Sequence, residues 1–313
     1  MVAPRPLQAR PALLAVALGA LLFGLSSPNR QATAGVPAKL LLQSICVAGT
    51  WQEYISIYNP NGTAVDLSDY YITDATHIGV NTLYIYIANR TAGIAGGGAF
   101  NDFHIRFPAG ARIAPHDTIA VAHQGTTRFL ISYGRKPAFE IGYPGMNDPE
   151  VPDMRAAFPG SVPGTPDSTT LTNGGECVVL YYWDGQSDLA TDVDYAFWGT
   201  NTGSYVVDKT GMSVDGPDAD TTPTAYQADT APAMQVPILS AAHPFGNAFR
   251  REDYTEGTQR SSGGNGVNGR DETSEPLNVT WSSNKPAAPP FVKAPNWTPA
   301  LPTTWGAIKT LLR

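Results

Sequence analysis

Aspartates gather in one turn-rich stretch of the chain, where Asp208, Asp215, Asp218 and Asp220 alternate with glycine, proline and threonine. Carboxylate and carbonyl oxygens are the ligands that Ca²⁺ prefers, and a turn-rich segment can bring several of them to one ion. The spacing of the four aspartates does not match that of an EF-hand loop. Two interpretations therefore stand, a calcium site of another kind and a hydrated acidic loop.

A second set of polar residues has the types that hydrolases use. Asp192 and Asp194 are two residues apart in a predicted strand, so they should lie on the same face of it. With Asp208 and His123 they form a candidate site for a secreted hydrolase of unfamiliar type. Carboxylates that cleave a glycosidic bond must flank a cleft, so the alternative for Asp192 and Asp194 is a solvated strand face.

The common catalytic motifs do not occur in the sequence. There is no Gly-x-Ser-x-Gly nucleophile elbow, and the five histidines lack the spacing of a zinc site. The glycine-rich segment 95–99 lacks the Gly-Lys-Ser/Thr ending of a phosphate-binding loop. The sequence therefore favours a protein that is not an enzyme.

Aromatic residues suggest a different use, because tyrosine and tryptophan can stack on sugars or anchor a protein partner. Neighbouring residues of a strand point to opposite faces, so at least half of these side chains must lie in the core. The candidates for a carbohydrate-binding or protein-binding face are Tyr70, Tyr71, Tyr84, Tyr86, Tyr181, Tyr182, Trp183 and Trp198.

The N-terminal segment predicts export. Residues 1–34 carry three arginines and no acid, then an uncharged run from Ala12 to Leu25, and end in Ala32-Thr33-Ala34. This is the order of charges, apolar residues and small residues in a cleaved signal peptide. The apolar run is shorter than the roughly 18 residues that span a bilayer, although a retained membrane anchor is the alternative. The mature protein is then secreted or held at the cell surface, with no transmembrane segment after cleavage.

The two cysteines, Cys46 and Cys177, lie in apolar segments that have the composition of strands. In an exported chain with two cysteines, a single disulfide between them is the simplest expectation. The alternative is two separate buried thiols, since cysteine also packs as a small hydrophobic residue.

Composition and pattern predict an all-β fold. Only 15% of the 313 residues are charged, whereas 31 are glycine and 27 are proline, which is a poor composition for exposed helices. Short apolar or alternating runs bounded by turn residues predict an antiparallel sandwich or barrel with long loop insertions. The predicted strands are 39–47, 53–58, 69–73, 83–88, 103–107, 118–123, 127–132, 176–183, 192–198 and 277–281.

Two neighbouring segments resemble the opening strands of the lamin tail domain as it occurs in secreted bacterial proteins. They are Glu53-Tyr54-Ile55-Ser56-Ile57-Tyr58-Asn59-Pro60 and Val65-Asp66-Leu67-Ser68-Asp69-Tyr70-Tyr71-Ile72-Thr73-Asp74. Weaker matches follow in order at 107–115, 174–180 and 246–251. The resemblance implies an immunoglobulin-like β-sandwich over residues 35–284 and no catalytic residue. Ser56 and Asp69 depart from the family pattern.

The C-terminal part divides into a proline-rich linker, 285–302, and a short segment, 303–313. Trp305, Ile308, Leu311 and Leu312 would share one face of a helix, so this segment is expected to order only when it docks on a partner or on the sandwich. A frayed tail is the alternative.

The sequence thus favours an exported, non-enzymatic β-sandwich module for binding, adhesion or structural interaction, with a protein or glycan ligand at the cell envelope. A carbohydrate-binding module and a secreted hydrolase are the alternatives. The net charge of −7 repels phosphate, so no nucleic-acid partner is expected. The only cofactor proposed is Ca²⁺.

Overall fold

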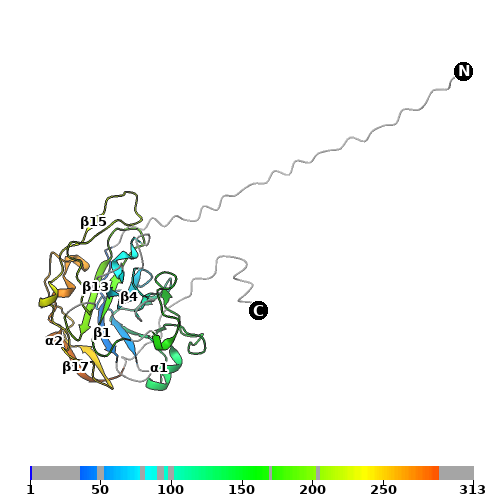
Figure 1. Cartoon of the computed structure of the whole chain (residues 1–313). Coiled ribbons are helices and arrows are strands. Elements are labelled where there is room, and N and C mark those ends of the chain that lie inside the picture. The colour runs from blue at the N-terminus through cyan, green and yellow to red at the C-terminus, as the bar shows by residue number, and fades with distance from the viewer. Residues whose placement is uncertain are drawn as a thin grey trace. The chain divides into compact units, whose positions relative to one another are not determined.

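The computed structural model describes Met1 and residues 36–47, 53–77, 82–89, 95–97, 102–168, 171–201 and 205–288. The predicted signal peptide, most of the proline-rich linker and the C-terminal segment 303–313 lie outside these residues. Figure 1 shows β1, β4 and β13 crossing the centre of the domain, with α1 at its periphery.

Six strands form the larger sheet, in the order β10-β9-β2-β1-β16-β17. Adjacent strands are antiparallel except for the parallel pair β9 and β10. The register of β1 against β2 shifts between Leu42 and Ser44. The strands are β1 (Leu41–Cys46), β2 (Tyr54–Tyr58), β9 (Thr118–Ala122), β10 (Phe139–Glu140), β16 (Asn247–Arg251) and β17 (Trp281–Pro286).

Five antiparallel strands form the second sheet, in the order β11-β7-β4-β12-β13. They are β4 (Tyr70–Thr73), β7 (His104–Arg106), β11 (Arg155–Ala156), β12 (Glu176–Tyr182) and β13 (Thr191–Trp198). The register of β12 against β13 shifts so that Leu180 pairs with Asp194 and Tyr181 with Asp192. Because Leu180 and Tyr181 are consecutive and point to opposite faces, Asp192 and Asp194 also point to opposite faces. The expectation that both lie on one face is therefore wrong.

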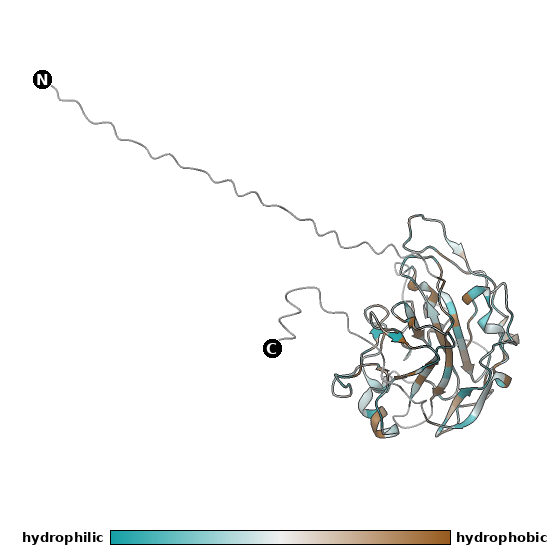
Figure 2. Cartoon of the chain, turned by 180° about the vertical axis from the view of Figure 1, so that it is seen from behind, coloured by the Kyte–Doolittle hydropathy of each residue, from teal (hydrophilic) through white to brown (hydrophobic). Residues whose placement is uncertain are grey.

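One hydrophobic core joins the two large sheets, which confirms the antiparallel β-sandwich. Ile55 and Ile57 of β2 lie in this core with Ile72 and Val179 of the second sheet. Tyr54 lies in a smaller cluster with Ala120 and Phe129. Both faces of β2 are therefore covered, and its side chains alternate between the two clusters. Figure 2 shows the apolar character of the central strands, while many peripheral segments are more polar.

Short elements complete the fold. Three two-stranded pairs are β3 (Val65–Asp66) with β8 (Arg112–Ile113), β5 (Thr76–His77) with β6 (Thr82–Leu83), and β14 (Ser213–Val214) with β15 (Thr224–Ala225). The helical segments are η1 (Tyr84–Ile87), α1 (Thr126–Tyr133), η2 (Pro166–Ser168), η4 (Pro232–Met234), η5 (Val267–Gly269), η6 (Glu272–Ser274) and α2 (Leu277–Thr280).

Three of the predicted strands are helical instead. Segment 83–88 contains η1, and segment 127–132 lies within α1, which buries Thr126 and Phe129 one turn apart. Gly134 ends α1 in the left-handed conformation that closes many helices. In segment 277–281, the first four residues form α2, and Trp281 begins β17, which continues to Pro286. Lys285 and Pro286, which the sequence assigns to the linker, therefore belong to β17.

The expected disulfide is also wrong, because Cys46 and Cys177 are separate buried thiols. Cys46 lies in the smaller cluster on the outer face of the six-stranded sheet, whereas Cys177 lies in the main core. The Cys46 thiol is 3.4 Å from the carbonyl oxygen of Asn247, and the Cys177 thiol is 3.2 Å from the hydroxyl of Thr76. Burial raises the pKa of Cys46 to about 12, so this thiol is unreactive at neutral pH.

Candidate functional site

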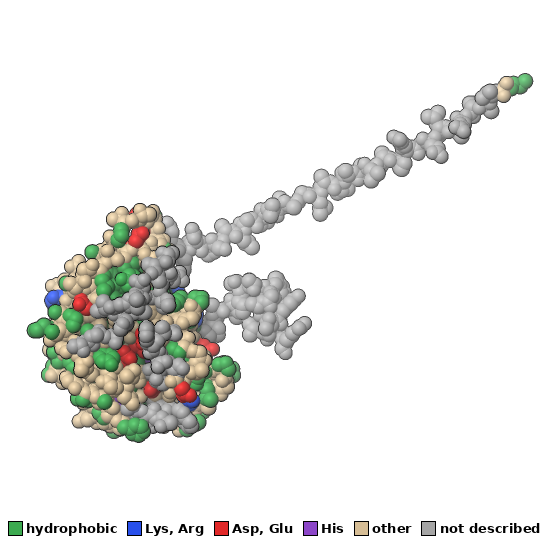
Figure 3. Space-filling view, in the orientation of Figure 1, with side chains coloured by type: hydrophobic (Ala, Val, Ile, Leu, Met, Phe, Trp, Pro, Cys, Tyr) green, Lys and Arg blue, Asp and Glu red, His purple; other side chains and the backbone are tan. Residues whose placement is uncertain are grey.

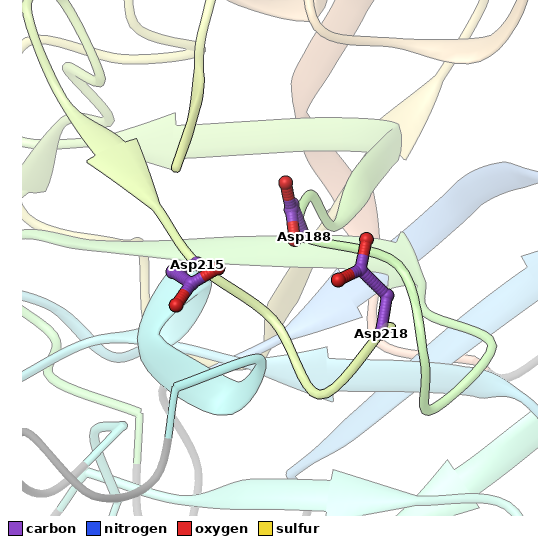
Figure 4. A group of neighbouring side chains, drawn as sticks. All are labelled: Asp188, Asp215 and Asp218. Atoms are coloured by element: carbon purple, nitrogen blue, oxygen red, sulfur yellow. The ribbon is translucent and has the colours of Figure 1, made fainter. Parts of the chain in front are cut away.

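Three aspartates from two loops meet at one edge of the domain. Asp188 lies in the connection between β12 and β13, and Asp215 and Asp218 follow β14 (Figure 4). One carboxylate oxygen from each residue lies within 4.8 Å of the other two. The sequence predicts Asp215 and Asp218 as ligands but gives no signal for Asp188. We call these three residues the aspartate trio.

Local hydrogen bonds explain how the two loops reach one another. The backbone N–H groups of Gln186 and Ser187 donate to Asp184 Oδ1 over 2.9 and 2.8 Å, which forms the turn before Asp188. Asp188 then accepts a 2.8 Å hydrogen bond from the backbone N–H of Gly216 and another from the Thr224 hydroxyl. A Cβ on Gly216 would lie 2.8 Å from the Cα of Asp188, so only glycine allows this close approach.

The pKa values of Asp188 and Asp215 shift in opposite directions. The Thr224 hydroxyl and the N–H of Gly216 lower the pKa of Asp188, so it stays anionic. Burial, and then the negative charges of Asp188, Asp218 and Asp220, raise the pKa of Asp215. Asp215 Oδ1 is buried and accepts no hydrogen bond from the described residues. A cation between the three carboxylates would remove this repulsion and give Asp215 Oδ1 a partner.

The other two predicted ligands lie outside the trio. Asp208 accepts a 3.0 Å hydrogen bond from the N–H of Thr210, and Asp220 accepts one of 2.7 Å from the N–H of Thr222. Both therefore use their carboxylates to fix local turns. Asp220 also acts on the trio, through its charge on Asp215 and through its backbone N–H, which donates to Asp218 Oδ1 over 3.0 Å.

The residues of the predicted hydrolase site are not gathered into one site. Asp192 accepts from Lys209 Nζ over 2.7 Å, and both oxygens of Asp194 accept from Arg251 Nη2 over 2.7 Å. Asp192 is 3% exposed and Asp194 is fully buried, so the alternative of a solvated strand face is wrong as well. His123 is buried with its ring 4.6 Å from that of Phe103.

Most of the aromatic candidates belong to the core. Tyr71 stacks on Tyr181 with ring centroids 4.8 Å apart, and Trp198 packs on Phe249. Of the eight residues considered, only Tyr86 and Tyr182 are partly exposed, and Tyr182 packs edge-on against Tyr70. The structure therefore provides no broad aromatic face from these residues for stacking on a sugar. The buried ones are Tyr70, Tyr71, Tyr84, Tyr181, Trp183 and Trp198.

Comparison with known proteins gives a structural similarity without a function. No family model matches the sequence, and no curated protein matches it. A crystal structure of a DUF4876 family protein from Bacteroides thetaiotaomicron VPI-5482 is similar to this chain with a TM-score of 0.41. The two sequences are 12% identical, and the similarity covers 85% of this chain and 75% of the other.

The surface of the domain is mixed in character. Acidic and apolar side chains are scattered over the face drawn in Figure 3, where basic side chains are few. Within the described part of the chain, no helix has the length and apolar character needed to cross a membrane.

Proposed function

We propose that this protein is an exported, non-enzymatic β-sandwich module for binding, adhesion or structural interaction at the cell surface, and that the aspartate trio binds Ca²⁺. The observation that carries the calcium site is the meeting of Asp188, Asp215 and Asp218 within 4.8 Å, from two loops held together at Gly216. The proposals of export and of a protein or glycan ligand rest on the sequence pattern of residues 1–34 and on the sandwich. The resemblance of residues 53–74 to lamin tail domains is our proposal for the fold family.

The chemistry of the trio favours Ca²⁺ over Mg²⁺ or a transition metal. All three ligands are hard carboxylate oxygens, and the flexible coordination of Ca²⁺ tolerates loops better than the strict octahedron of Mg²⁺. Ca²⁺ takes six to eight oxygen ligands, so backbone carbonyls and water would supply those that the three carboxylates do not. We expect a dissociation constant of about 10⁻⁴ to 10⁻³ M, as in other extracellular calcium modules.

The arrangement of Asp192 and Asp194 argues against the alternative of a hydrolase site at these residues. Asp192 and Asp194 would have to act as acid and base in a hydrolase, but each is buried and held by a different cation. A group that performs acid–base catalysis must come within hydrogen-bond distance of a substrate. Neither carboxylate can do so while the surrounding side chains stay packed.

Calcium titration of the full chain tests the metal site. Isothermal titration calorimetry should show one binding event, and Ca²⁺ at 100 times the dissociation constant should stabilise the fold by about 2.7 kcal/mol against an EDTA reference. The double variant Asp215→Asn and Asp218→Asn should abolish both effects. Asp208→Asn is the matched control, because it removes a charge from the same acidic segment outside the trio and should bind Ca²⁺ unchanged. Absence of binding by the parent protein would contradict the proposal.

A further inference from the structure

Lys209 is a buried amine held between two carboxylates. Its Nζ lies 2.7 Å from Asp192 Oδ2 and 3.0 Å from Asp229 Oδ2. The side chain of Lys209 is fully buried, and those of Asp192 and Asp229 are 4% and 1% exposed. The amine nitrogen is therefore at hydrogen-bond distance from two carboxyl groups that water does not reach.

Aromatic rings enclose this group. The hydroxyl of Tyr84 donates to Asp192 Oδ1 and lies 3.3 Å from Lys209 Nζ. The rings of Tyr84 and Tyr226 have their centroids 5.8 and 6.0 Å from Nζ. Such surroundings have a low dielectric constant, in which separated charges are costly and neutral groups are favoured.

The two carboxylates have different surroundings. Asp229 accepts a 2.7 Å hydrogen bond from the backbone N–H of Lys209 and a 2.8 Å bond from Asn265 Nδ2, which fix its position. Asp192 accepts the hydroxyl of Tyr84 on Oδ1, whereas its other oxygen, Oδ2, accepts from the amine. That hydroxyl is placed to stabilise negative charge on Oδ1 if a nucleophile attacks the Asp192 carboxyl carbon.

The charges of the group do not balance, since one ammonium faces two carboxylates. Removing ions from water is costly even after the protein relaxes around them, and pairing offsets that cost only in part. Condensation of the amine with one carboxyl would remove two of the three charges and leave a neutral amide. The low dielectric constant therefore favours the condensed product over the ion pair.

We propose that Lys209 and Asp192 join in an intramolecular isopeptide bond, with Asp229 as the group that moves the protons. Asp229 takes a proton from the Lys209 ammonium, and the free amine attacks Cγ of Asp192. The Nζ–Cγ bond forms and the Cγ–Oδ2 bond breaks. Two of the three ammonium protons leave with Oδ2 as water, one of them relayed by Asp229, and the third stays on the amide nitrogen. The reaction needs no oxidant or other reactant. Asp229 gives up the proton that it took from Lys209, so its protonation state is the same before and after the reaction.

The protonation of the two groups agrees with this order of steps. Burial lowers the pKa of Lys209, but the charges of Asp192 and Asp229 outweigh it and leave the pKa raised, so the amine must first give up a proton. Burial raises the pKa of Asp229 in spite of the Lys209 charge, which makes Asp229 a better proton acceptor than an exposed aspartate.

The bond would fasten a long loop to the sandwich. Asp192 lies in β13, and Lys209 lies at the start of the loop that carries Asp215 and Asp218. A covalent link at this point would hold that loop to the second sheet when its hydrogen bonds open. The inference does not depend on calcium binding, since it uses none of the trio.

Tryptic mapping of the denatured full chain measures the bond directly. Trypsin cleaves after free lysine, and Lys209 is the only Lys or Arg between Arg155 and Arg250. Without the bond, digestion gives two peptides, 156–209 and 210–250. With it, the acylated Lys209 resists cleavage, and one peptide 156–250 appears with a mass lower than expected by one water molecule. Complete cleavage after Lys209 in the purified parent protein would overturn the proposal.

Variants assign the roles of the three residues. Asp229→Asn should leave Lys209 open to trypsin and the mass unchanged, because the proton acceptor is lost. Asp208→Asn removes the carboxylate of the residue next to Lys209 in the sequence, which lies outside the buried group, and should retain the linked peptide. Full linkage in Asp229→Asn would overturn the role of Asp229. The map of the parent protein decides on the bond itself, even where a variant fails to fold.

Discussion

Two buried ion networks lie on opposite faces of strand β13, one at Asp192 and one at Asp194. Among the residues that the structure describes, Lys209 and Arg251 are the Lys or Arg side chains with no exposure, and each holds one of these aspartates. Lys209 is shared by two carboxylates, whereas Arg251 is part of a larger set with Lys39 and four carboxylates. The four are Asp194, Glu256, Glu272 and Glu275.

The difference lies in what each cation can do. The guanidinium of Arg251 donates to Asp194, to Glu275 over 3.0 Å and to the carbonyl oxygen of Leu42 over 2.8 Å. It keeps its proton at any accessible pH, so it serves as a fixed connection between β16, β13 and β1. The amine of Lys209 can give up a proton and become a nucleophile. The same strand therefore carries one network suited to structure and one suited to covalent chemistry.

Removing the side chain of Arg251 should lower the free energy of unfolding more than any other substitution proposed below. Arg251→Met leaves Asp194 and Glu275 buried without their partner, which we expect to cost about 3–5 kcal/mol in the free energy of unfolding. Arg251→Lys should recover only a small part, because an ammonium cannot reproduce the forked hydrogen bonds. Urea unfolding followed by tryptophan fluorescence measures both. A loss below about 1 kcal/mol for Arg251→Met, the size typical of an exposed pair, would show that the network is not structural.

Removing Lys209 should cost somewhat less, about 3 kcal/mol, because a smaller set of charges loses its partner. Lys209→Met leaves Asp192 and Asp229 uncompensated, so adding Asp192→Asn to it should restore part of the loss. The same unfolding measurement compares the single and double variants. If the double variant is no more stable than Lys209→Met, repulsion between the two aspartates is not the cause of the loss.

The larger network should also make stability fall as the pH rises. Burial, and then the charge of Asp194, raise the pKa of Glu256 from 4.5 to about 7 in spite of Lys39 and Arg251. The folded state then holds this proton more tightly than the unfolded state. Its contribution to stability is complete below pH 4.5 and is lost as the pH rises through about 7.

Glu256→Gln tests this dependence, because glutamine resembles the protonated side chain and does not titrate. The variant should lose less stability than the parent protein between pH 5 and pH 8, as measured by thermal unfolding. Asp66→Asn is the control, since Asp66 is exposed and pairs loosely with Arg112 at 3.8 Å. Parallel pH profiles for the parent protein and Glu256→Gln would contradict the assignment.

The sequence predicts the strands of the sheets better than it predicts the site. Strands depend on residues close together in the sequence, whereas the site depends on contacts between residues far apart in the chain. Alternation of Ile55 and Ile57 with Tyr54 reveals a strand, because side-chain direction in a strand depends on neighbours along the chain. Segment 127–132 has the composition of a strand, but α1 forms there because Phe129 packs on Tyr54 of a distant strand. Asp192 and Asp194 face oppositely only because the register of β12 shifts beside them. Asp188 joins the trio through Gly216, a contact that no local pattern marks.

The smallest effect on stability should come from the aspartate trio, in which Asp218 is exposed and Asp215 is partly exposed, and this sharpens the contrast with the buried networks. Among the described residues, Asp188 and Asp218 accept hydrogen bonds from neutral donors, the N–H groups of Gly216 and Asp220 and the Thr224 hydroxyl. Solvent reaches Asp215 and Asp218, so it screens the repulsion within the trio more than it screens the buried charges. Asp215→Asn should therefore stabilise the protein slightly in EDTA, by less than about 1 kcal/mol in the free energy of unfolding, and the gain should shrink at high salt.

In saturating Ca²⁺ the order of stability should reverse, with the parent protein more stable than Asp215→Asn, because the ion needs the Asp215 carboxylate as a ligand. Differential scanning calorimetry in EDTA and in Ca²⁺ measures the reversal. A variant that is less stable under both conditions would show that Asp215 is held by contacts within the loop, and one that responds to Ca²⁺ like the parent protein would remove it from the metal site.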